Sequence, residues 1–179
     1  DDTFMLYNPA DSEKYPHRIL PFGTSNGKYT AVKLSAQTDV STYTLTNENG
    51  NHLPIFKFDT LDDLNQFKAK YDGVLALDQG YNSVLSFNEA LTKAQWDREG
   101  FFKDHSLLAV YVPANSGSLR FALHNIEVTY ESICVYVEQT NRPEIFTEDM
   151  AGWFVLVEIA DDEIRNCYAY DAIFVNSEK

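Results

Sequence analysis

The chain has 179 residues, of which 44% are hydrophobic and 14% aromatic, and its formal net charge at pH 7 is −13. This composition is typical of a folded globular protein and excludes a disordered chain, and the length suits one domain, residues 1–179. The negative charge disfavours binding to the phosphates of nucleic acids and to anionic membrane surfaces, and no run reaches the roughly 20 apolar residues of a membrane-spanning helix.

Residues 1–58 are predicted to form a strand-rich N-terminal extension of this domain. A short apolar segment at 4–7 and loose alternation of apolar residues at 29–34 and 40–45 favour strands, and the last two would pair across their connection. A further strand is predicted at 52–58, after a turn that contains Asn-Gly. We expect these strands to flank or extend the main sheet rather than to form a separate domain.

Two helices are predicted next. A helix is predicted from Thr60 to Tyr71, because apolar residues recur there at spacings of three and four. The side chain of Thr60 can cap the start of this helix. Ser86 and Glu89 form a capping box, in which each side chain bonds the other residue's backbone N–H, and they open a second helix. Gly100 stands at the C′ position, where a glycine commonly ends a helix.

Four strands are predicted in the second half of the chain. Residues 107–112 form a continuous apolar run, which suits a strand covered on both faces. Residues 118–130 alternate with a slip near His124, which predicts a β-bulge, and residues 133–138 alternate again. Residues 153–159 form a last buried strand. Because the connections are too short for crossover helices, these four strands are predicted to form an antiparallel meander.

The predicted fold class is α+β, with a largely antiparallel β-sheet and two α-helices packed on it. Within the single domain, residues 59–179 hold the two helices and the β-meander. The acidic residues 161–163 favour a short helical turn, and residues 172–175 favour a last short strand.

Motifs for catalysis, metal binding or nucleotide binding are absent from the sequence. The histidines are far apart and have neither an HExxH pattern nor a cysteine at zinc-ligand spacing; they are His17, His52, His105 and His124. No catalytic residue, metal site or cofactor is therefore predicted. Asp161–Glu163 could hold a calcium ion, but a solvated acidic turn is the simpler interpretation. Cys134 and Cys167 either pair in an oxidising compartment or remain free thiols, and their spacing does not decide between the two.

Three tyrosines are the candidate interaction residues, because Tyr81, Tyr168 and Tyr170 lie in polar, loop-like surroundings. Exposed tyrosines combine apolar area with a hydroxyl group, are enriched at protein interfaces, and can also stack on sugars. The alternative is that these rings pack half-buried at the edges of the sheet, which is the commoner place for a tyrosine.

The second half of the chain also resembles a known family. The order FFKDHSLLAVYV, NSGSLRF, a strand pair and DMAGWFVLVEI is similar to secreted or lipid-anchored proteins of Gram-positive bacteria that are related to the C-terminal domain of the protease complex subunit PrcB. The positions of the family pattern are filled by Phe101, Phe102, Ser116, Gly117, Ser118, Gly152 and Trp153. PrcB-like chains often carry two glycines in the turn, where this chain has only Gly117. The resemblance implies an extracytoplasmic setting and a protease-associated role, and it supplies no catalytic residues.

These observations lead us to expect a non-catalytic extracytoplasmic domain for protein interaction or regulation, with an unknown protein partner at the cell envelope. The alternative is a small-ligand or glycan-binding module that uses its exposed tyrosines. The chain begins at Asp1 without Met, which fits a mature form whose targeting segment or upstream lipid anchor is not part of this sequence. An enzyme would need carboxylates or histidines that converge from distant positions in the chain.

Overall fold

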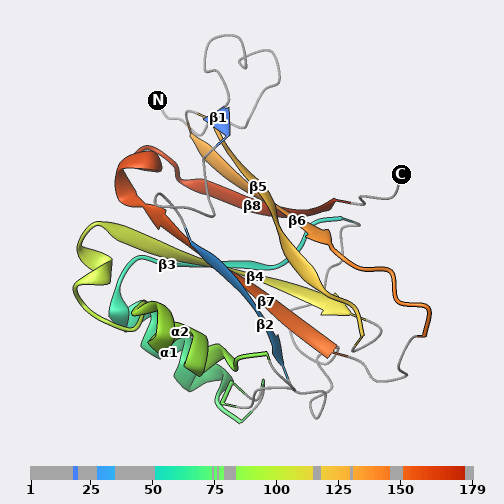
Figure 1. The fold of residues 1–179 in the computed structure, drawn as a ribbon. Coiled ribbons are helices and arrows are strands. Elements are labelled where there is room, and N and C mark those ends of the chain that lie inside the picture. Colours follow the sequence, from blue (N-terminus) through green and yellow to red (C-terminus); the bar gives the residue numbers. More distant parts are fainter. Residues whose placement is uncertain are drawn as a thin grey trace.

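The fold has three layers, described here from a computed structural model of the chain (Figure 1). The structure describes residues 18–19, 28–34, 51–73, 75, 77–78, 84–114, 118–129, 131–145 and 151–175. Two helices cover one face of a central sheet, and a second sheet covers its other face. The α+β class is therefore confirmed, with the strands divided between two sheets.

The described elements are eight strands, two helices and two short 3-10 turns. The strands of the central sheet are β2 (Tyr29–Leu34), β3 (Ile55–Phe58), β4 (His105–Ala114) and β7 (Ala151–Ala160). The strands of the second sheet are β1 (Arg18–Ile19), β5 (Phe121–Val128), β6 (Ser132–Gln139) and β8 (Ala169–Val175). The helices are α1 (Leu61–Tyr71) and α2 (Phe87–Ala94), and the 3-10 turns are η3 (Phe101–Lys103) and η4 (Asp161–Glu163).

The strand order differs from the predicted meander. The central sheet has the order β2-β7-β4-β3 and is antiparallel throughout. The second sheet has the order β1-β5-β6-β8, in which β6 and β8 run parallel. Of the four strands predicted to form the meander, only β5 and β6 pair as sequential neighbours, whereas β4 and β7 pair with each other in the other sheet. The meander of four sequential strands is therefore wrong.

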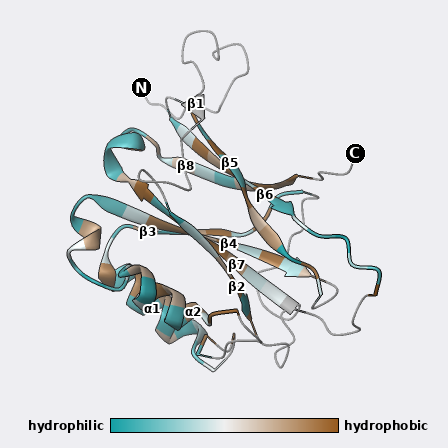
Figure 2. Ribbon diagram, viewed as in Figure 1, coloured by the Kyte–Doolittle hydropathy of each residue, from teal (hydrophilic) through white to brown (hydrophobic). Residues whose placement is uncertain are grey.

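The apolar pattern of each strand explains this division. β4 and β7 are buried along almost their whole length and are apolar on both faces, so each needs cover on both sides. Only the central layer provides such cover, from the helices on one face and from the second sheet on the other. β5 and β6 alternate between buried and partly exposed residues, so cover on one face is enough for them. Figure 2 shows this alternation along β5 as brown and paler bands.

β5 contains the predicted β-bulge. Its pairing with β6 shifts register between Leu123 and Asn125, so that His124 is the extra residue. The extra residue keeps both Leu123 and Ile126 on the buried face of the strand. The predicted acidic turn and the predicted last strand are also present, as η4 and β8.

Two hydrophobic cores lie on the two faces of the central sheet. The core between the sheets takes alternate residues of β4 and β7 together with the buried side chains of the second sheet; they include Leu108, Val110, Val155, Val157, Leu123, Ile126 and Val135. The core under the helices takes the other alternate residues and is rich in aromatic rings. Phe67, Phe87 and Phe154 contact one another there, with ring centroids 5.4–5.8 Å apart.

Both predicted helices are present with the predicted caps. At the start of α1, the N–H of Asp63 donates to Oγ1 of Thr60 at 3.0 Å. At the start of α2, the N–H of Glu89 donates to Oγ of Ser86 at 3.1 Å, and the N–H of Ser86 donates to Oε1 of Glu89 at 2.9 Å. These bonds satisfy backbone donors that the first turn of a helix leaves without partners.

Gly100 is not the C′ residue of α2, contrary to the prediction. The helix ends at Ala94, and Gln95 adopts the left-handed conformation with φ of 62°. The helix ends before Gly100 because Trp96 is fully buried against the sheet. The indole N–H of Trp96 donates to Oε1 of Glu158 on β7 at 2.9 Å, and this contact is not compatible with a continued helix. Gly100 instead directly precedes η3.

β2 and β3 extend the central sheet on its two sides, as expected for strands of the N-terminal region. β3 begins at Ile55 rather than at residue 52, because Asn51–Leu53 bond to β8 of the second sheet instead. The predicted strands at 4–7 and 40–45 lie outside the described residues, and the described partner of β2 is β7.

Gly152 is a point of close approach in β7. A Cβ atom on Gly152 would lie 2.5 Å from Oη of Tyr111 and 2.7 Å from its Cε1. Tyr111 is fully buried under the helices, and this burial raises the pKa of its phenol above the ordinary value. The ring therefore occupies the space that any larger residue at position 152 would need.

We expect Gly152→Ala to lower the free energy of unfolding by about 1–3 kcal/mol, because the new methyl group would overlap a buried ring. Gly100→Ala is the matched control, since no atom lies within 4 Å of its Cβ position and its φ of −61° suits alanine. Urea unfolding of both variants measures the difference. Equal stability of the two variants would contradict this account of Gly152.

Candidate functional site

Tyr168 and Tyr170 lie together at the start of β8, the outermost strand of the second sheet. The exposed fraction is 56% for Tyr168 and 43% for Tyr170, and among the described large hydrophobic residues only Ile145, at 81%, is more exposed. Both rings are therefore exposed rather than half-buried. Tyr81, the third candidate, lies outside the described residues.

The backbone on both sides of these tyrosines is held in place by hydrogen bonds. The N–H of Tyr168 donates to the carbonyl oxygen of Glu131 at 3.0 Å, and its hydroxyl donates to the carboxylate of the same residue at 3.1 Å. The N–H of Ala169 donates to the same carbonyl at 3.3 Å and begins the parallel pairing of β8 with β6. The two rings are thus presented by an ordered strand.

The described residues cover the outer edge of β8 over only part of its length. The N–H of Leu53 donates to the carbonyl of Ala172 at 2.9 Å, and the N–H of Phe174 donates to the carbonyl of Asn51 at 2.8 Å. The chain then leaves β8 at Pro54, whose carbonyl bonds to β4 in the central sheet. The segment Asn51–Phe58 therefore passes from one sheet to the other.

Asp171 stands at the end of the covered part of the edge. Its carboxylate accepts the N–H of Ala172 at 2.8 Å, and it contacts Nδ1 of His52 at 2.8 Å. The Asp171 carboxylate thus accepts the N–H that a backbone carbonyl would accept if the pairing of Asn51–Leu53 with β8 continued.

The outer face of the second sheet carries carboxylates on both sides of a cysteine. Glu127, Cys134 and Asp171 are register neighbours on β5, β6 and β8. Burial, with a smaller contribution from the carboxylates of Asp171 and Glu127, raises the pKa of the Cys134 thiol to about 11. Burial also raises the pKa of Tyr136, whose hydroxyl donates to Glu127 at 3.1 Å. Cys134 and Cys167 do not form a disulfide with each other.

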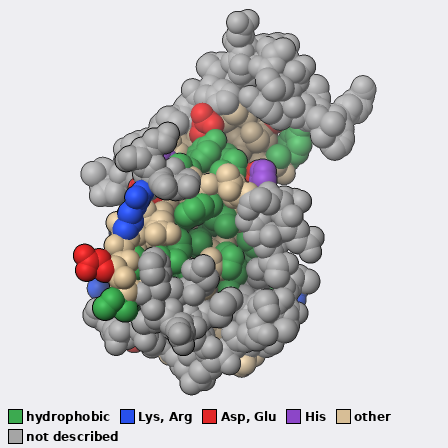
Figure 3. Space-filling model, turned by 90° about the vertical axis from the view of Figure 1, so that its right-hand side faces the viewer, with side chains coloured by type: hydrophobic (Ala, Val, Ile, Leu, Met, Phe, Trp, Pro, Cys, Tyr) green, Lys and Arg blue, Asp and Glu red, His purple; other side chains and the backbone are tan. Residues whose placement is uncertain are grey.

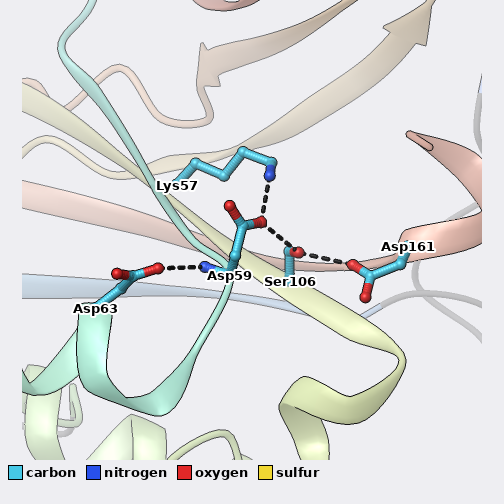
Figure 4. Close-up of polar contacts among 5 residues, drawn as sticks. All are labelled: Lys57, Asp59, Asp63, Ser106 and Asp161. Atoms are coloured by element: carbon cyan, nitrogen blue, oxygen red, sulfur yellow. Dashed lines mark hydrogen bonds and ion pairs between the residues drawn. The ribbon is translucent and has the colours of Figure 1, made fainter. Parts of the chain in front are cut away.

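A polar cluster joins the ends of three strands of the central sheet (Figure 4). Ser106 is only 1% exposed, and its Oγ lies 2.9 Å from Oδ1 of Asp59 and 2.7 Å from Oδ1 of Asp161. Lys57 pairs with Asp59, and the N–H of Asp59 donates to Asp63 of α1 at 3.1 Å. A hydroxyl has one proton, so Ser106 donates to one carboxylate at a time. The buried hydroxyl therefore ties elements together and is not open to a substrate.

His105 begins β4 and lies between two carboxylates. Its Nδ1 is 2.6 Å from Oδ1 of Asp104, and its Nε2 is 4.0 Å from Oε2 of Glu158. The ring stacks on Phe101 with a centroid distance of 5.3 Å. Because successive residues of a strand point to opposite faces, His105 and Ser106 do not form a base–nucleophile pair. Ion pairing and stacking fix His105 at the border of the helix-side core.

Gly152 and Trp153, from the family-like pattern, pack in the interior. Trp153 is 2% exposed and contacts Phe121, with ring centroids 6.0 Å apart. The guanidinium carbon of Arg120 lies 5.5 Å from the centre of a Trp153 ring, which is a cation–π distance. These residues therefore contribute to core packing at this end of β7.

The other residues of the pattern lie elsewhere. Phe101 and Phe102 form part of η3 at the opposite end of β4 and pack, partly buried, against the helix-side core. Ser118 is partly buried, and its carbonyl accepts a side-chain amide at 2.8 Å. Ser116 and Gly117 lie outside the described residues. The described residues of the pattern do not converge on one site, and their contacts are those of packing.

The sequence patterns did not identify Ser106, His105 or Asp171, the residues at the centre of the polar contacts described above. Ser106 and His105 belong to a polar triplet, Asp104-His105-Ser106, directly before the apolar run of β4, and that triplet was the one local signal. The partners of Ser106 are 47 and 55 positions away in the sequence, so the pattern gave no means of finding them. Asp171 had no distinguishing local signal.

Among the residues that the structure describes, no group of three or more His, Cys, Asp and Glu side chains is arranged to hold a metal ion. The acidic residues 161–163 thus form the turn η4 without such a group around them. No helix in the described ranges is long and apolar enough to cross a membrane.

Comparisons of this chain with known proteins find no match among family models, curated proteins or solved structures. The resemblance to PrcB-like domains stays a prediction from the residues quoted for it.

We expect Cys134 to react slowly with iodoacetamide, because a thiol with a pKa of about 11 is almost fully protonated near neutral pH. At pH 8 its thiolate fraction should be roughly a hundredfold below that of a cysteine with a pKa of 9. Mass spectrometry of the alkylated peptides measures the rate of each cysteine separately.

The pH profile separates the raised pKa from simple shielding of the thiol. The rate of Cys134 should keep rising above pH 10, whereas in denaturant it should level off near pH 9. Asp171→Asn should shift the folded profile to lower pH, because it removes a nearby negative charge. A folded profile that levels off at the same pH as the denatured one would contradict the assignment.

Proposed function

We propose that this chain is a non-catalytic interaction domain that acts outside the cytoplasm and binds a partner protein at the cell envelope through Tyr168 and Tyr170. The observation that carries the proposal is the exposure of both rings, two residues apart, on a strand whose start is held by Glu131. Tyr170 is the second residue of β8, and Tyr168 directly precedes the strand.

Rigid, exposed tyrosines suit protein binding for two physical reasons. A tyrosine ring offers a large contact area and loses few rotamers on binding, and its hydroxyl can exchange water for a partner's polar group. The hydrogen bonds of Tyr168 and Ala169 to Glu131 fix the backbone in advance, so little ordering remains to oppose binding. By contrast, Ile145 is a single exposed apolar side chain, of a kind that is common on protein surfaces.

The described titratable groups support a non-catalytic role. The hydroxyl of Ser106 is buried between two carboxylates, and His105 lies on the other face of β4. His105 is itself engaged by Asp104 and stacked on Phe101. These contacts hold strand ends together, and they do not leave a nucleophile next to a base.

The extracytoplasmic setting and the protease-associated role rest on the resemblance to PrcB-like domains. The net charge of −13 also suits a soluble or tethered protein that does not bind anionic membrane surfaces.

We expect fractionation of the source cells to recover the protein in the envelope or the medium, as the resemblance implies. Immunodetection with a cytoplasmic marker as the control measures this. Recovery with the cytoplasmic marker would contradict the proposed location and the role at the envelope.

A glycan or small ligand is the alternative partner for the same two rings, because exposed aromatic rings stack on sugars. A glycan array distinguishes the alternatives. A specific sugar that requires both tyrosines would favour the second function, whereas uniformly low signals would remove it.

We expect the wild-type domain, cross-linked in envelope extracts, to capture one specific protein, and the variant Tyr168→Ser/Tyr170→Ser to capture about tenfold less or lower still, because interface tyrosines often carry much of the binding free energy. Quantitative mass spectrometry of the captured protein measures the ratio.

Ile145→Ser is the matched control, because it removes an even more exposed apolar side chain from another part of the surface. It should leave capture unchanged. Equal capture by the double variant and the wild type, or no protein above background in repeated experiments, would count against the proposal.

A further inference from the structure

We propose that the open part of the β8 edge, Ala169–Asp171, accepts an extended, positively charged peptide segment of a partner protein as an additional β-strand. The inference rests on the proposed interaction function and adds how the partner binds and which charge it carries.

The backbone groups of Tyr170 point to the outer side of β8. Ala169 directs its N–H to the β6 side, where it donates to the carbonyl of Glu131. Backbone groups of successive residues in a strand point alternately to its two sides, and Ala172 accordingly uses its carbonyl on the outer side, toward Leu53. Among the described residues, no backbone group pairs with the N–H or C=O of Tyr170.

Within the described ranges, the passage of the chain between the sheets leaves this part of the edge without a partner strand. If the antiparallel pairing of Asn51–Leu53 with β8 continued, Ile55 would lie opposite Tyr170. Instead the chain departs at Pro54, and Ile55 pairs with Val110 in the central sheet. A strand edge with outward N–H and C=O groups is a template for another extended chain, which gains affinity from main-chain hydrogen bonds.

A second copy of this chain does not fit the edge. Antiparallel pairing of two copies about Tyr170 would place the Asp171 side chains of the two copies diagonally across the strand pair on the same face, where long or charged side chains still interact and like charges repel. The net charge of −13 adds a repulsion between whole chains. The occupant is therefore a different chain of opposite charge.

The surroundings of the edge are negative. Asp171, which also contacts His52, is the last residue of the open segment. Glu131 contacts Tyr168 beside it, and Glu127 is two strands away in the same row. Asp171 and Glu127 both lie next to Cys134 in this row, where their charge adds to the larger effect of burial in raising the pKa of its thiol. Lysine or arginine side chains of an added strand would face these carboxylates.

Apolar contacts are available next to the same edge. The exposed rings of Tyr168 and Tyr170 stand at the start of β8, so an added strand would cover them while its backbone pairs with Tyr170. In Figure 1 the start of β8 lies at the left, away from the face that Figure 3 shows, on which other hydrophobic side chains gather. Aromatic side chains next to polar groups are typical of a docking surface.

The test uses two labelled ten-residue peptides, one of alternating threonine and lysine and one of alternating threonine and glutamate, and measures fluorescence anisotropy with the whole protein. We expect the lysine peptide to bind at least about tenfold more tightly than the glutamate peptide and to weaken as salt rises. Equal affinity of the two peptides, or no binding of the lysine peptide, would overturn the charge assignment.

Two substitutions at one position separate backbone pairing from ring contacts. Tyr170→Ser removes the ring and keeps the backbone N–H, whereas Tyr170→Pro removes both. Proline is tolerated where the N–H of an edge strand faces outward, so the ladder with β6 should persist. We expect the proline variant to bind the lysine peptide about tenfold more weakly than the serine variant. Equal affinities of the two variants would overturn the strand-addition model.

A modified peptide keeps the test decisive if the proline variant fails to fold. Methylation of the backbone nitrogens along one edge of the lysine peptide removes the N–H groups that a strand would donate, and the wild-type protein should then lose binding about tenfold or more. Unchanged binding would overturn the proposal. If capture of the cellular partner requires Tyr168 and Tyr170 but these peptide experiments fail, the interaction function stands and the strand-addition mode is wrong.

Discussion

Burial of β4 and β7 on both faces is the constraint on which the rest of the structure depends. Both strands are apolar on each side. Leaving either apolar face in water would cost roughly 25 cal/mol for each Å² of exposed apolar surface. The helices cover one face of the central sheet, and the second sheet covers the other. The helices and the second sheet are themselves amphipathic, because each has only one side packed against the central sheet. The three-layer arrangement, the strand order and the exposed outer face of the second sheet all follow from this requirement.

The passage of Asn51–Phe58 from one sheet to the other is the second organising feature. This segment bonds to β8 and then to β4, so it closes one side of the space between the sheets. Its departure at Pro54 also leaves the first residues of β8 without a partner strand among the described residues. One backbone path therefore both secures the inter-sheet core and exposes the surface that carries Tyr168 and Tyr170.

The sequence predicts this fold where the determining interactions are local. The caps at Thr60 and Ser86, the bulge at His124 and the acidic turn depend on residues a few positions apart, and all of them are present. Strand pairing depends on distant residues, so the meander was wrong although its strands exist. The end of α2 was misplaced because a contact between Trp96 and the distant Glu158 outweighed the local glycine signal.

Pairing of β2 with β7 joins the N-terminal region to the last third of the chain, from Tyr29 opposite Val157 to Leu34 opposite Gly152. Contacts between such distant positions form slowly, because the loss of chain entropy comes before the gain in contact energy. A growing chain on the ribosome would hold β2 and β4 without the strand that lies between them until residues 151–160 are made. The apolar faces of these two strands are therefore open to chaperones until β7 emerges, and only then can the central layer be completed.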